Sequence, residues 1–255
     1  MSSASSWPVG NWLLDALSLD EYQRLAVYLR PANVSLGEIV YESGGQMANV
    51  FFPITAHVSL LYTMLDGATA EMGLVGNEGV VGISLFMGGD TTPNEAVVQG
   101  AGKGLKLDAR RMQEEFRRGS EFQLVLLRYT QALMTQISQT AVCNRLHSVE
   151  HRLCRWLLMN LDRTQSNKLE MTHDLIAARL GVRREGISVV AKGLQQRGLI
   201  KYVRGHIQIL DRSGLESCAC ECYSVVKKEH DRLVSIRVHG RAPRTSDRET
   251  ERLQL

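Results

Sequence analysis

The sequence predicts a mixed α+β fold, in which an N-terminal β jelly roll, a long helix and a C-terminal winged helix-turn-helix follow one another. Three observations predict it: short glycine-punctuated β-rich segments fill residues 37–108, a long amphipathic stretch spans residues 121–145, and residues 172–200 have the spacing of two helices joined at a glycine. With 255 residues and 44% hydrophobic content, the chain is long enough for two domains.

The N-terminal part consists of one short helix and many short strands. The helix spans residues 18–29, and Ser18 is a suitable N-cap for it. A hairpin turn is expected at Asp66 and Gly67. The strand-like segments are 37–45, 49–55, 57–64, 69–76, 79–86, 95–100 and 102–108. Short strands at this spacing are typical of a β-sandwich or jelly roll.

The middle of the chain is helical. A helix starts near Asp108, breaks around Gly119 and resumes as a long helix from Glu121 to Arg145. Apolar residues recur along one stripe of this long helix. Such a stripe is expected for dimerisation with a second copy, and burial against the chain's own β-domain explains it equally well. The apolar stripe consists of Phe122, Leu126, Tyr129, Leu133 and Ile137. A further amphipathic helix, capped by Ser148, opens the last domain.

A helix-turn-helix follows. Thr172 caps the first helix, Gly181 supplies a left-handed turn, and the second helix turns Ile187, Val190 and Leu194 toward the first. The remaining face of the second helix carries charged and polar side chains that can reach base edges or phosphates in DNA. An ordinary amphipathic helix pair has the same apolar spacing.

A β-hairpin directly after these helices predicts a wing. Two β-rich runs, residues 199–203 and 206–210, flank Arg204 and Gly205. Basic side chains near its tip are suited to phosphate contacts, although solvated hairpins carry such charges as often. The candidate DNA-contacting residues of both motifs are Thr172, Arg183, Arg184, Glu185, Ser188, Lys192, Lys201, Arg204 and His206.

Charge is distributed unevenly along the chain. Residues 1–118 hold 8 Lys and Arg against 13 Asp and Glu, a net charge of −5, whereas residues 148–216 hold 12 against 7, a net charge of +5. A basic domain is attracted to the phosphate backbone of nucleic acid, and an acidic domain is kept off it.

Neither a membrane segment nor a signal peptide is apparent. No apolar run approaches the roughly 20 residues that cross a bilayer, and the N-terminus lacks a basic-then-apolar pattern. We therefore expect a cytoplasmic protein without membrane contacts. The five cysteines, an odd number, then indicate reduced thiols.

Three cysteines, Cys218, Cys220 and Cys222, form a CxCxC cluster after the wing. Thiolates this close bind zinc, another soft metal or an iron–sulfur cluster, but the spacing is not the usual CxxC and a fourth ligand is not obvious. Cys154 and His230 are candidates for that fourth ligand. His147 and His151, four residues apart, are a separate candidate metal clamp, and we expect this pair to flank a hinge instead. We expect buried or surface thiols here, and neither a metal nor another cofactor.

The chain also carries the segments GEIVYESGG, VFFP, GNEGVVG, VRREGIS and ILDRSGLE, and Ala177, Gly181, Ile187 and Val190 in the helix-turn-helix. In these residues and in the order of its parts, nearly the whole chain resembles the Crp/Fnr family of bacterial transcription regulators. The resemblance implies a cyclic-nucleotide-binding-like domain at residues 1–118, a dimerisation helix at 119–147 and a winged helix-turn-helix domain at 148–234. It also implies a homodimer that binds pseudo-palindromic double-stranded DNA, with RNA polymerase as a further partner. The mixed-charge tail, 235–255, is expected to be disordered.

Two departures from the family bear on specificity. Arg184 and Glu185 match by position the family's pair that contacts base edges, but Val189 replaces a further Arg found in many members. The family's cyclic AMP site uses a Gly-Glu pair for the ribose and an Arg-Ser or Arg-Thr pair for the phosphate. Here Val80 replaces the Glu.

The later pair of the cyclic AMP site is also absent, because Pro93 and Asn94 stand in its place. Burial of a phosphate without a cation costs several kcal/mol. We therefore expect an effector other than cyclic AMP, an unknown small molecule, or no effector. The expected effector pocket consists of Gly79, Val80, Gly82, Pro93 and Asn94.

Taken with the charge pattern, the motifs favour a sequence-specific DNA-binding transcription regulator that acts as a homodimer. Two alternatives stay open: a metal- or redox-responsive regulator that uses the CxCxC cluster, and a ligand-binding interaction module without DNA binding. We do not expect an enzyme, because no GxSxG, P-loop, HExxH or GxGxxG motif occurs.

Overall fold

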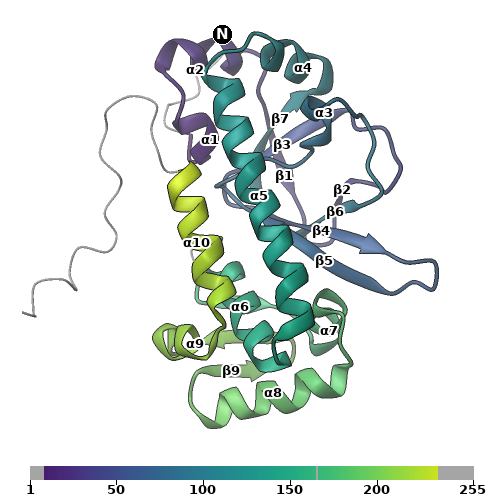
Figure 1. Ribbon diagram of the computed structural model, residues 1–255, viewed down its shortest axis with the longest axis vertical. Helices are drawn as coiled ribbons and strands as arrows, with labels where there is room; N and C mark the ends of the chain where they lie inside the picture. Colours follow the sequence, from purple (N-terminus) through teal and green to yellow (C-terminus); the bar gives the residue numbers. More distant parts are fainter. Residues whose placement is uncertain (1–8, 165, 235–255) are drawn as a thin grey trace, which may run out of the picture.

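The computed structural model describes residues 9–164 and 166–234, which form a β-domain, a long helix and a winged-helix domain (Figure 1). The β-domain has two antiparallel sheets, with strand orders β1-β7-β3 and β2-β6-β4-β5. The strands are β1 (Arg30–Val34), β2 (Ile39–Tyr41), β3 (Asn49–Pro53), β4 (His57–Thr63), β5 (Thr69–Val75), β6 (Glu95–Gly100) and β7 (Gly102–Asp108). The predicted α+β class is confirmed, while the tail at 235–255 lies outside the described residues.

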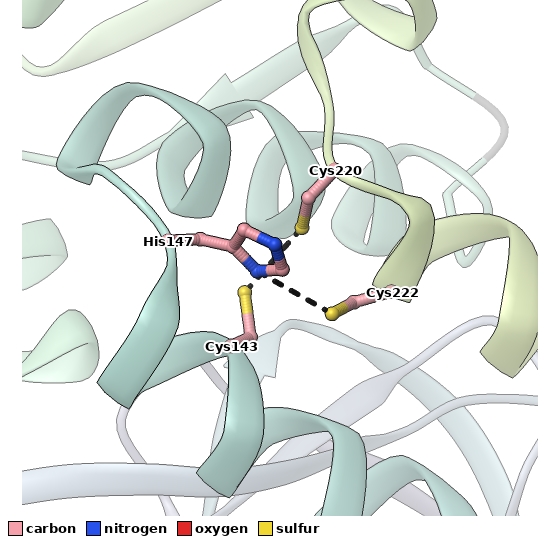
Figure 2. A group of neighbouring side chains, drawn as sticks. All are labelled: Cys143, His147, Cys220 and Cys222. Carbon is pink, nitrogen blue, oxygen red and sulfur yellow. Dashed lines mark hydrogen bonds between the residues drawn. The ribbon is translucent and has the colours of Figure 1, made fainter.

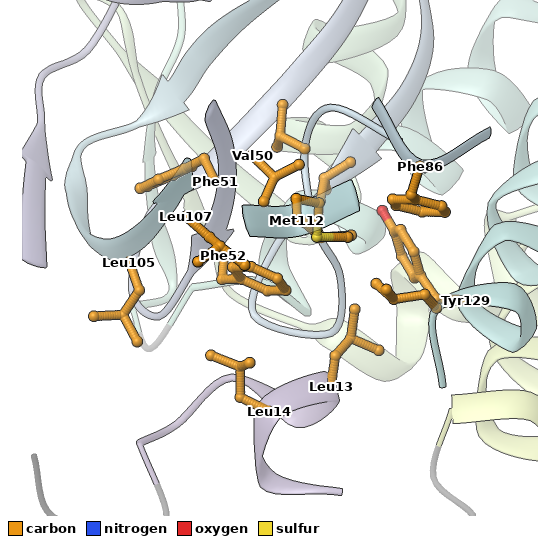
Figure 3. Close-up of a cluster of buried hydrophobic side chains, with 14 of the residues drawn as sticks. Leu13, Leu14, Val50, Phe51, Phe52, Phe86, Leu105, Leu107, Met112 and Tyr129 are labelled. Carbon is orange, nitrogen blue, oxygen red and sulfur yellow. The ribbon is translucent and has the colours of Figure 1, made fainter. Parts of the chain in front are cut away.

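One hydrophobic core fills the β-domain (Figure 3). Four short helices border it: α1 (Trp12–Asp15), α2 (Leu19–Ala26), α3 (Ser84–Met87) and α4 (Ala109–Arg117). Val50, Phe51 and Phe52 of β3 are all buried, because both faces of this strand are covered. The ring of Phe52 packs against that of Phe122 at a centroid distance of 6.5 Å, which fixes the start of the long helix on the β-domain.

Several local elements differ from the sequence prediction, since α1 and β8 (Lys168–Glu170) were not expected, and β1 and the segment 79–86 also differ. β1 has no strand-like pattern because it contains Pro31, which is tolerated at the edge position that β1 occupies in its sheet. The strand expected at residues 79–86 is reduced to one bridge between Val81 and Phe51, followed by α3. Gly82, with a φ of 98°, interrupts the extended run at this point.

The long helix α5 (Glu121–Leu146) runs from the β-domain to the winged-helix domain, and α10 (Glu221–Val234) packs along it (Figure 1). The stripe expected to mediate dimerisation lies inside the protomer, in or against the core of the β-domain. Its residues are Phe122, Leu126, Tyr129, Leu133 and Ile137. Phe122, Leu126, Tyr129 and Leu133 are buried and Ile137 is half-buried, so in the protomer the stripe packs against the chain's own β-domain, as one of the two interpretations expected. Dimerisation itself stays a prediction.

The winged-helix domain has its own core, to which Trp156, Ile187 and Leu215 contribute. Its elements are α6 (Val149–Leu161), β8 (Lys168–Glu170), α7 (His173–Leu180), α8 (Arg184–Gln196), β9 (Ile200–Val203), β10 (His206–Ile209) and α9 (Arg212–Cys218). Ser148 caps α6 as predicted, since its side chain accepts a hydrogen bond from the N–H of His151. Across residues 9–164 and 166–234, no helix is both long and apolar enough to cross a membrane.

Buried polar contacts join the two domains. The indole N–H of Trp156 donates to Glu71 of β5 at 2.8 Å. Nε of Arg179, on α7, donates to Oε1 of Gln99, on β6, at 3.3 Å. α7 therefore rests against the β-domain, and α8 lies at the opposite end of the molecule (Figure 1).

Candidate nucleic-acid interface

The helix-turn-helix has the local geometry that its sequence predicts. Oγ1 of Thr172 accepts a hydrogen bond from the N–H of Leu175 at 3.2 Å and so caps α7. Gly181 ends α7 in the left-handed conformation, with a φ of 60°. Arg183, in extended conformation, precedes α8. The turn between the helices thus takes only residues 181–183.

The first turn of α8 presents charged side chains to solvent. Arg184 and Glu185 are exposed, as are Arg183 before them and Lys192 further along the helix. Nε of Arg184 lies 3.3 Å from Oδ1 of Asp174, and solvent screens this exposed pair. Arg184 is therefore oriented at the start of the helix by a contact weak enough to be exchanged for a base or a phosphate.

Ser188 has a second role inside the motif. Its Oγ lies 3.0 Å from Nδ1 of His173, whose ring stacks on Tyr202 of β9 at a centroid distance of 4.1 Å. Burial and the positive charge of Arg184 lower the pKa of His173, so the ring is neutral at pH 7. The expected DNA contact Ser188 is thus half-buried and also joins α8 to α7 and the wing.

The wing is a tight hairpin. Arg204 and Gly205 have φ values of 47° and 83°, and positive φ at both central residues is typical of a type I′ turn. The N–H of Met171 donates to the carbonyl of Gly205 at 2.7 Å, which fixes the wing tip beside the start of α7. Lys201, Arg204 and His206 are exposed, as phosphate contacts require.

Val189, an exposed residue of α8, was not among the expected contacts. Val189 lies four residues after Glu185, on the same helix face, and its side chain is 71% exposed. An exposed apolar side chain on such a face is suited to the methyl group of thymine. The signal is present in the sequence, because Val189 is out of phase with the buried residues Ile187 and Leu194.

The expected effector pocket is filled by the protein's own side chains at the end formed by Gly79 and Val80. Val80 is fully buried in the core. The ring of Tyr129 lies so close to Gly79 that a Cβ at this position would be 2.4 Å from Cε2 of the ring. No space for a ribose is left between them.

The other end of this region also lacks a cation. Nδ2 of Asn94 donates to the hydroxyl of Tyr41 at 2.8 Å, and the carbonyl of Pro93 accepts from Oγ of Ser43 at 2.7 Å. Two hollows, of about 340 and 180 Å³, lie elsewhere, around Arg163, and no residue of the expected pocket lines either of them.

Four metal-ligating side chains meet where α5, the start of α6 and the start of α10 come together (Figure 2). The group consists of Cys143, His147, Cys220 and Cys222, whose ligand atoms all lie within 4.8 Å of one another. The three thiols are buried and none forms a disulfide. Cys218, the remaining member of the CxCxC motif, is outside the group, and its Sγ lies 3.5 Å from Nη1 of Arg197.

The other speculative ligands lie outside this group as well. Cys154 belongs to the core of the winged-helix domain. The ring of His230 packs against that of Tyr129 at 6.3 Å, and the ring of His151 is 6.0 Å from that of His147. Cys143 was not among the predicted ligands, although it lies in the last turn of α5, four residues before its C-cap His147.

Comparisons with known proteins agree with this architecture. A family model described as a Crp-like helix-turn-helix domain matches residues 151–218. A protein from Eubacterium rectale assigned to the Crp/Fnr family is 18% identical, with a TM-score of 0.65 over 81% of this chain and 96% of that one. FixK2 from Bradyrhizobium japonicum is 14% identical, with a TM-score of 0.63 over 75% of this chain and 98% of that one.

A third solved structure has the same fold. CLP from Xanthomonas campestris, a global regulator described as responsive to c-di-GMP, is 17% identical, with a TM-score of 0.60 over 76% of this chain and 100% of that one. No curated protein matches the chain. The resemblance inferred from the sequence is confirmed for the helix-turn-helix domain and for the fold.

Proposed function

Because the chain has a Crp-like helix-turn-helix domain within the fold of Crp/Fnr transcription regulators, we propose that it is a sequence-specific DNA-binding transcription regulator. The exposed start of α8, with Arg184 and Glu185 beside a basic wing, carries this proposal. Arg pairs with guanine and Glu with the cytosine amine, while the wing positions the protein on phosphates. The proteins of this fold compared above are regulators, and we assign no catalytic activity.

The proposal includes a homodimer, formed by a different face of α5 from the one that the sequence indicated. Leu124, Leu127 and Met134 are exposed on the face opposite the buried stripe. Leu127, Met134 and Ala141 recur every seven positions, the spacing of one core position of a two-stranded coiled coil, and Leu124 is followed at the same interval by the polar Gln131 and Ser138. Two copies paired along this seam present two α8 helices to the half-sites of a pseudo-palindrome.

Cyclic AMP is not the effector in this proposal, because Val80 and Tyr129 fill the ribose position and no Arg stands at the phosphate position. Isothermal titration calorimetry should show no saturable binding at micromolar cyclic AMP, and DNA affinity should not respond to it. Micromolar binding of cyclic AMP together with a large gain in DNA affinity would contradict the exclusion of cyclic AMP as effector. The effector, if one exists, and contact with RNA polymerase stay predictions.

Selection from a random duplex library tests the proposal as a whole. A regulator of this kind should enrich one motif with two inverted half-sites about one helical turn apart. Enrichment of no motif, or of a single half-site only, would contradict it. Since such a protein acts on the chromosome, we place it in the bacterial cytoplasm.

A further inference from the structure

The group of three thiols and one imidazole has the dimensions of a tetrahedral metal site. Sγ of Cys143 is 3.5 Å from Sγ of Cys220, and Sγ of Cys222 is 3.6 Å from Nδ1 of His147 (Figure 2). In a zinc site, bond lengths of about 2.3 Å to sulfur and 2.0 Å to nitrogen place sulfurs about 3.8 Å apart and sulfur and nitrogen about 3.6 Å apart. These two separations are close to those of a tetrahedral zinc site, and the remaining ligand atoms lie within 4.8 Å of one another, near enough to close around one Zn²⁺ ion with small side-chain shifts.

The surroundings of the group favour a cation bound to thiolates. Nε2 of His147 lies 3.4 Å from Oε2 of Glu221, so a proton shared with this carboxylate leaves Nδ1 free to face the sulfurs. Arg155 is buried nearby, and its Nε has no hydrogen-bond partner within the described chain. Three thiolates around a divalent cation carry a net charge of −1, which the guanidinium of Arg155 balances.

The position of the group in the chain suggests what the metal does. His147 is the last residue before Ser148, where the chain enters the winged-helix domain, and α9 ends at Cys218, where the chain leaves it. The ligands thus flank both connections between the winged-helix domain and the α5–α10 pair. An ion held by all of them fixes the direction in which the domain leaves α5.

We infer that Cys143, His147, Cys220 and Cys222 bind one Zn²⁺ ion, which clamps the winged-helix domain to the end of α5. Four protein ligands close the coordination shell, as in structural zinc sites, and leave no position for a substrate. An iron–sulfur cluster fits less well, because its irons each need a separate thiolate and four ligand atoms within 4.8 Å leave room for a single ion.

Metal uptake by the full-length protein tests the site. Protein stripped by a chelator under reducing conditions should bind about one Co²⁺ per chain, with thiolate-to-cobalt charge-transfer bands, and Zn²⁺ should displace the Co²⁺. Cys143→Ser and Cys222→Ser should lose these bands, whereas Cys218→Ser, altered in the same CxCxC motif but outside the group, should keep them. Circular dichroism would verify that each variant is folded.

A more conservative variant tests the contact between His147 and Glu221. Glu221→Gln removes the carboxylate without touching a ligand and should weaken zinc binding by about 10- to 100-fold. Reduced wild-type protein that gives no cobalt bands would overturn the site. So would loss of the bands in Cys218→Ser to the same degree as in Cys222→Ser, or a Cys143–Cys220 disulfide whose reduction restores no metal binding.

The clamp itself rests on the proposed DNA-binding function. The metal-free dimer should bind the selected duplex about 5- to 150-fold more weakly than the zinc-loaded dimer, which is the usual range of coupling between two sites. Equal DNA affinity of both forms would contradict the clamp. Metal uptake without any DNA binding by the zinc-loaded protein would instead contradict the proposed function, while the uptake would still support the site.

Discussion

Arg184 and Glu185 show how much of the proposed recognition depends on single side chains at the exposed start of α8. Arg184 is held by Asp174 through a screened pair, and Glu185 is exposed beside it. Val189 follows on the same face, where a further Arg would stand in many relatives. An apolar side chain there replaces a hydrogen-bonding contact by a methyl contact, so the half-site should favour thymine at that position.

Replacing Arg184 with Ala should relax the base preference at one position of each half-site. The lost two-pronged contact is worth about 1 to 3 kcal/mol. Selection from a random library reports the preference, and Lys192→Ala serves as control, because loss of a phosphate contact weakens all sequences alike. An unchanged motif for Arg184→Ala would contradict the assigned role.

At the scale of elements, the sequence predicts a helix end correctly where one residue at that end decides the backbone conformation. Gly181, Thr172 and Ser148 mark helix ends through their own backbone or hydroxyl, and the structure has these ends as predicted. The buried stripe of α5 could not be assigned from its spacing, because the same pattern suits a β-domain or a second copy. Cys220 and Cys222 were candidate metal ligands in the sequence, but their grouping with Cys143 could not be predicted, since Cys143 and Cys220 are 77 residues apart.

The exposed face of α5 should carry the dimer. Leu127 and Met134 are 49% and 60% exposed, and the double substitution L127E/M134E places like charges against each other across a two-fold seam. Multi-angle light scattering should report a monomer for this variant and a dimer for the wild type. Leu65→Glu, an equally drastic change at an exposed turn, should stay dimeric. A dimeric double variant would contradict this interface.

At the scale of the whole molecule, a buried ion pair adds to the polar contacts that hold the winged-helix domain on the β-domain. Nη2 of Arg163 lies 2.6 Å from Oε1 of Glu78, with the side chains only 7% and 8% exposed. Burial alone would raise the pKa of Glu78, but Arg163, His230 and backbone hydrogen bonds outweigh it, and the pKa lies below its ordinary value of 4.5. The pair is therefore ionised at neutral pH.

Arg163→Met should lower the free energy of unfolding by about 3 to 5 kcal/mol, because it leaves the carboxylate of Glu78 buried without its partner. Urea denaturation measures this loss. Arg110→Met, which breaks a pair whose arginine is 87% exposed, should cost at most about 1 kcal/mol. The stabilisation by Glu78 is complete above pH 4.5 and is lost as the pH falls through its lowered pKa. Equal losses for both variants would contradict the role of the buried pair.

The central claim is that the chain is a dimeric, sequence-specific DNA-binding regulator, and fluorescence anisotropy with a selected two-fold symmetric duplex tests it most directly. The zinc-loaded protein should bind this duplex about 10³-fold or more tightly than a scrambled one. The logarithm of the association constant should fall linearly with the logarithm of the salt concentration, because the basic wing and α8 release counterions from phosphates. Equal affinity for the scrambled duplex, or no binding at low salt, would contradict the account.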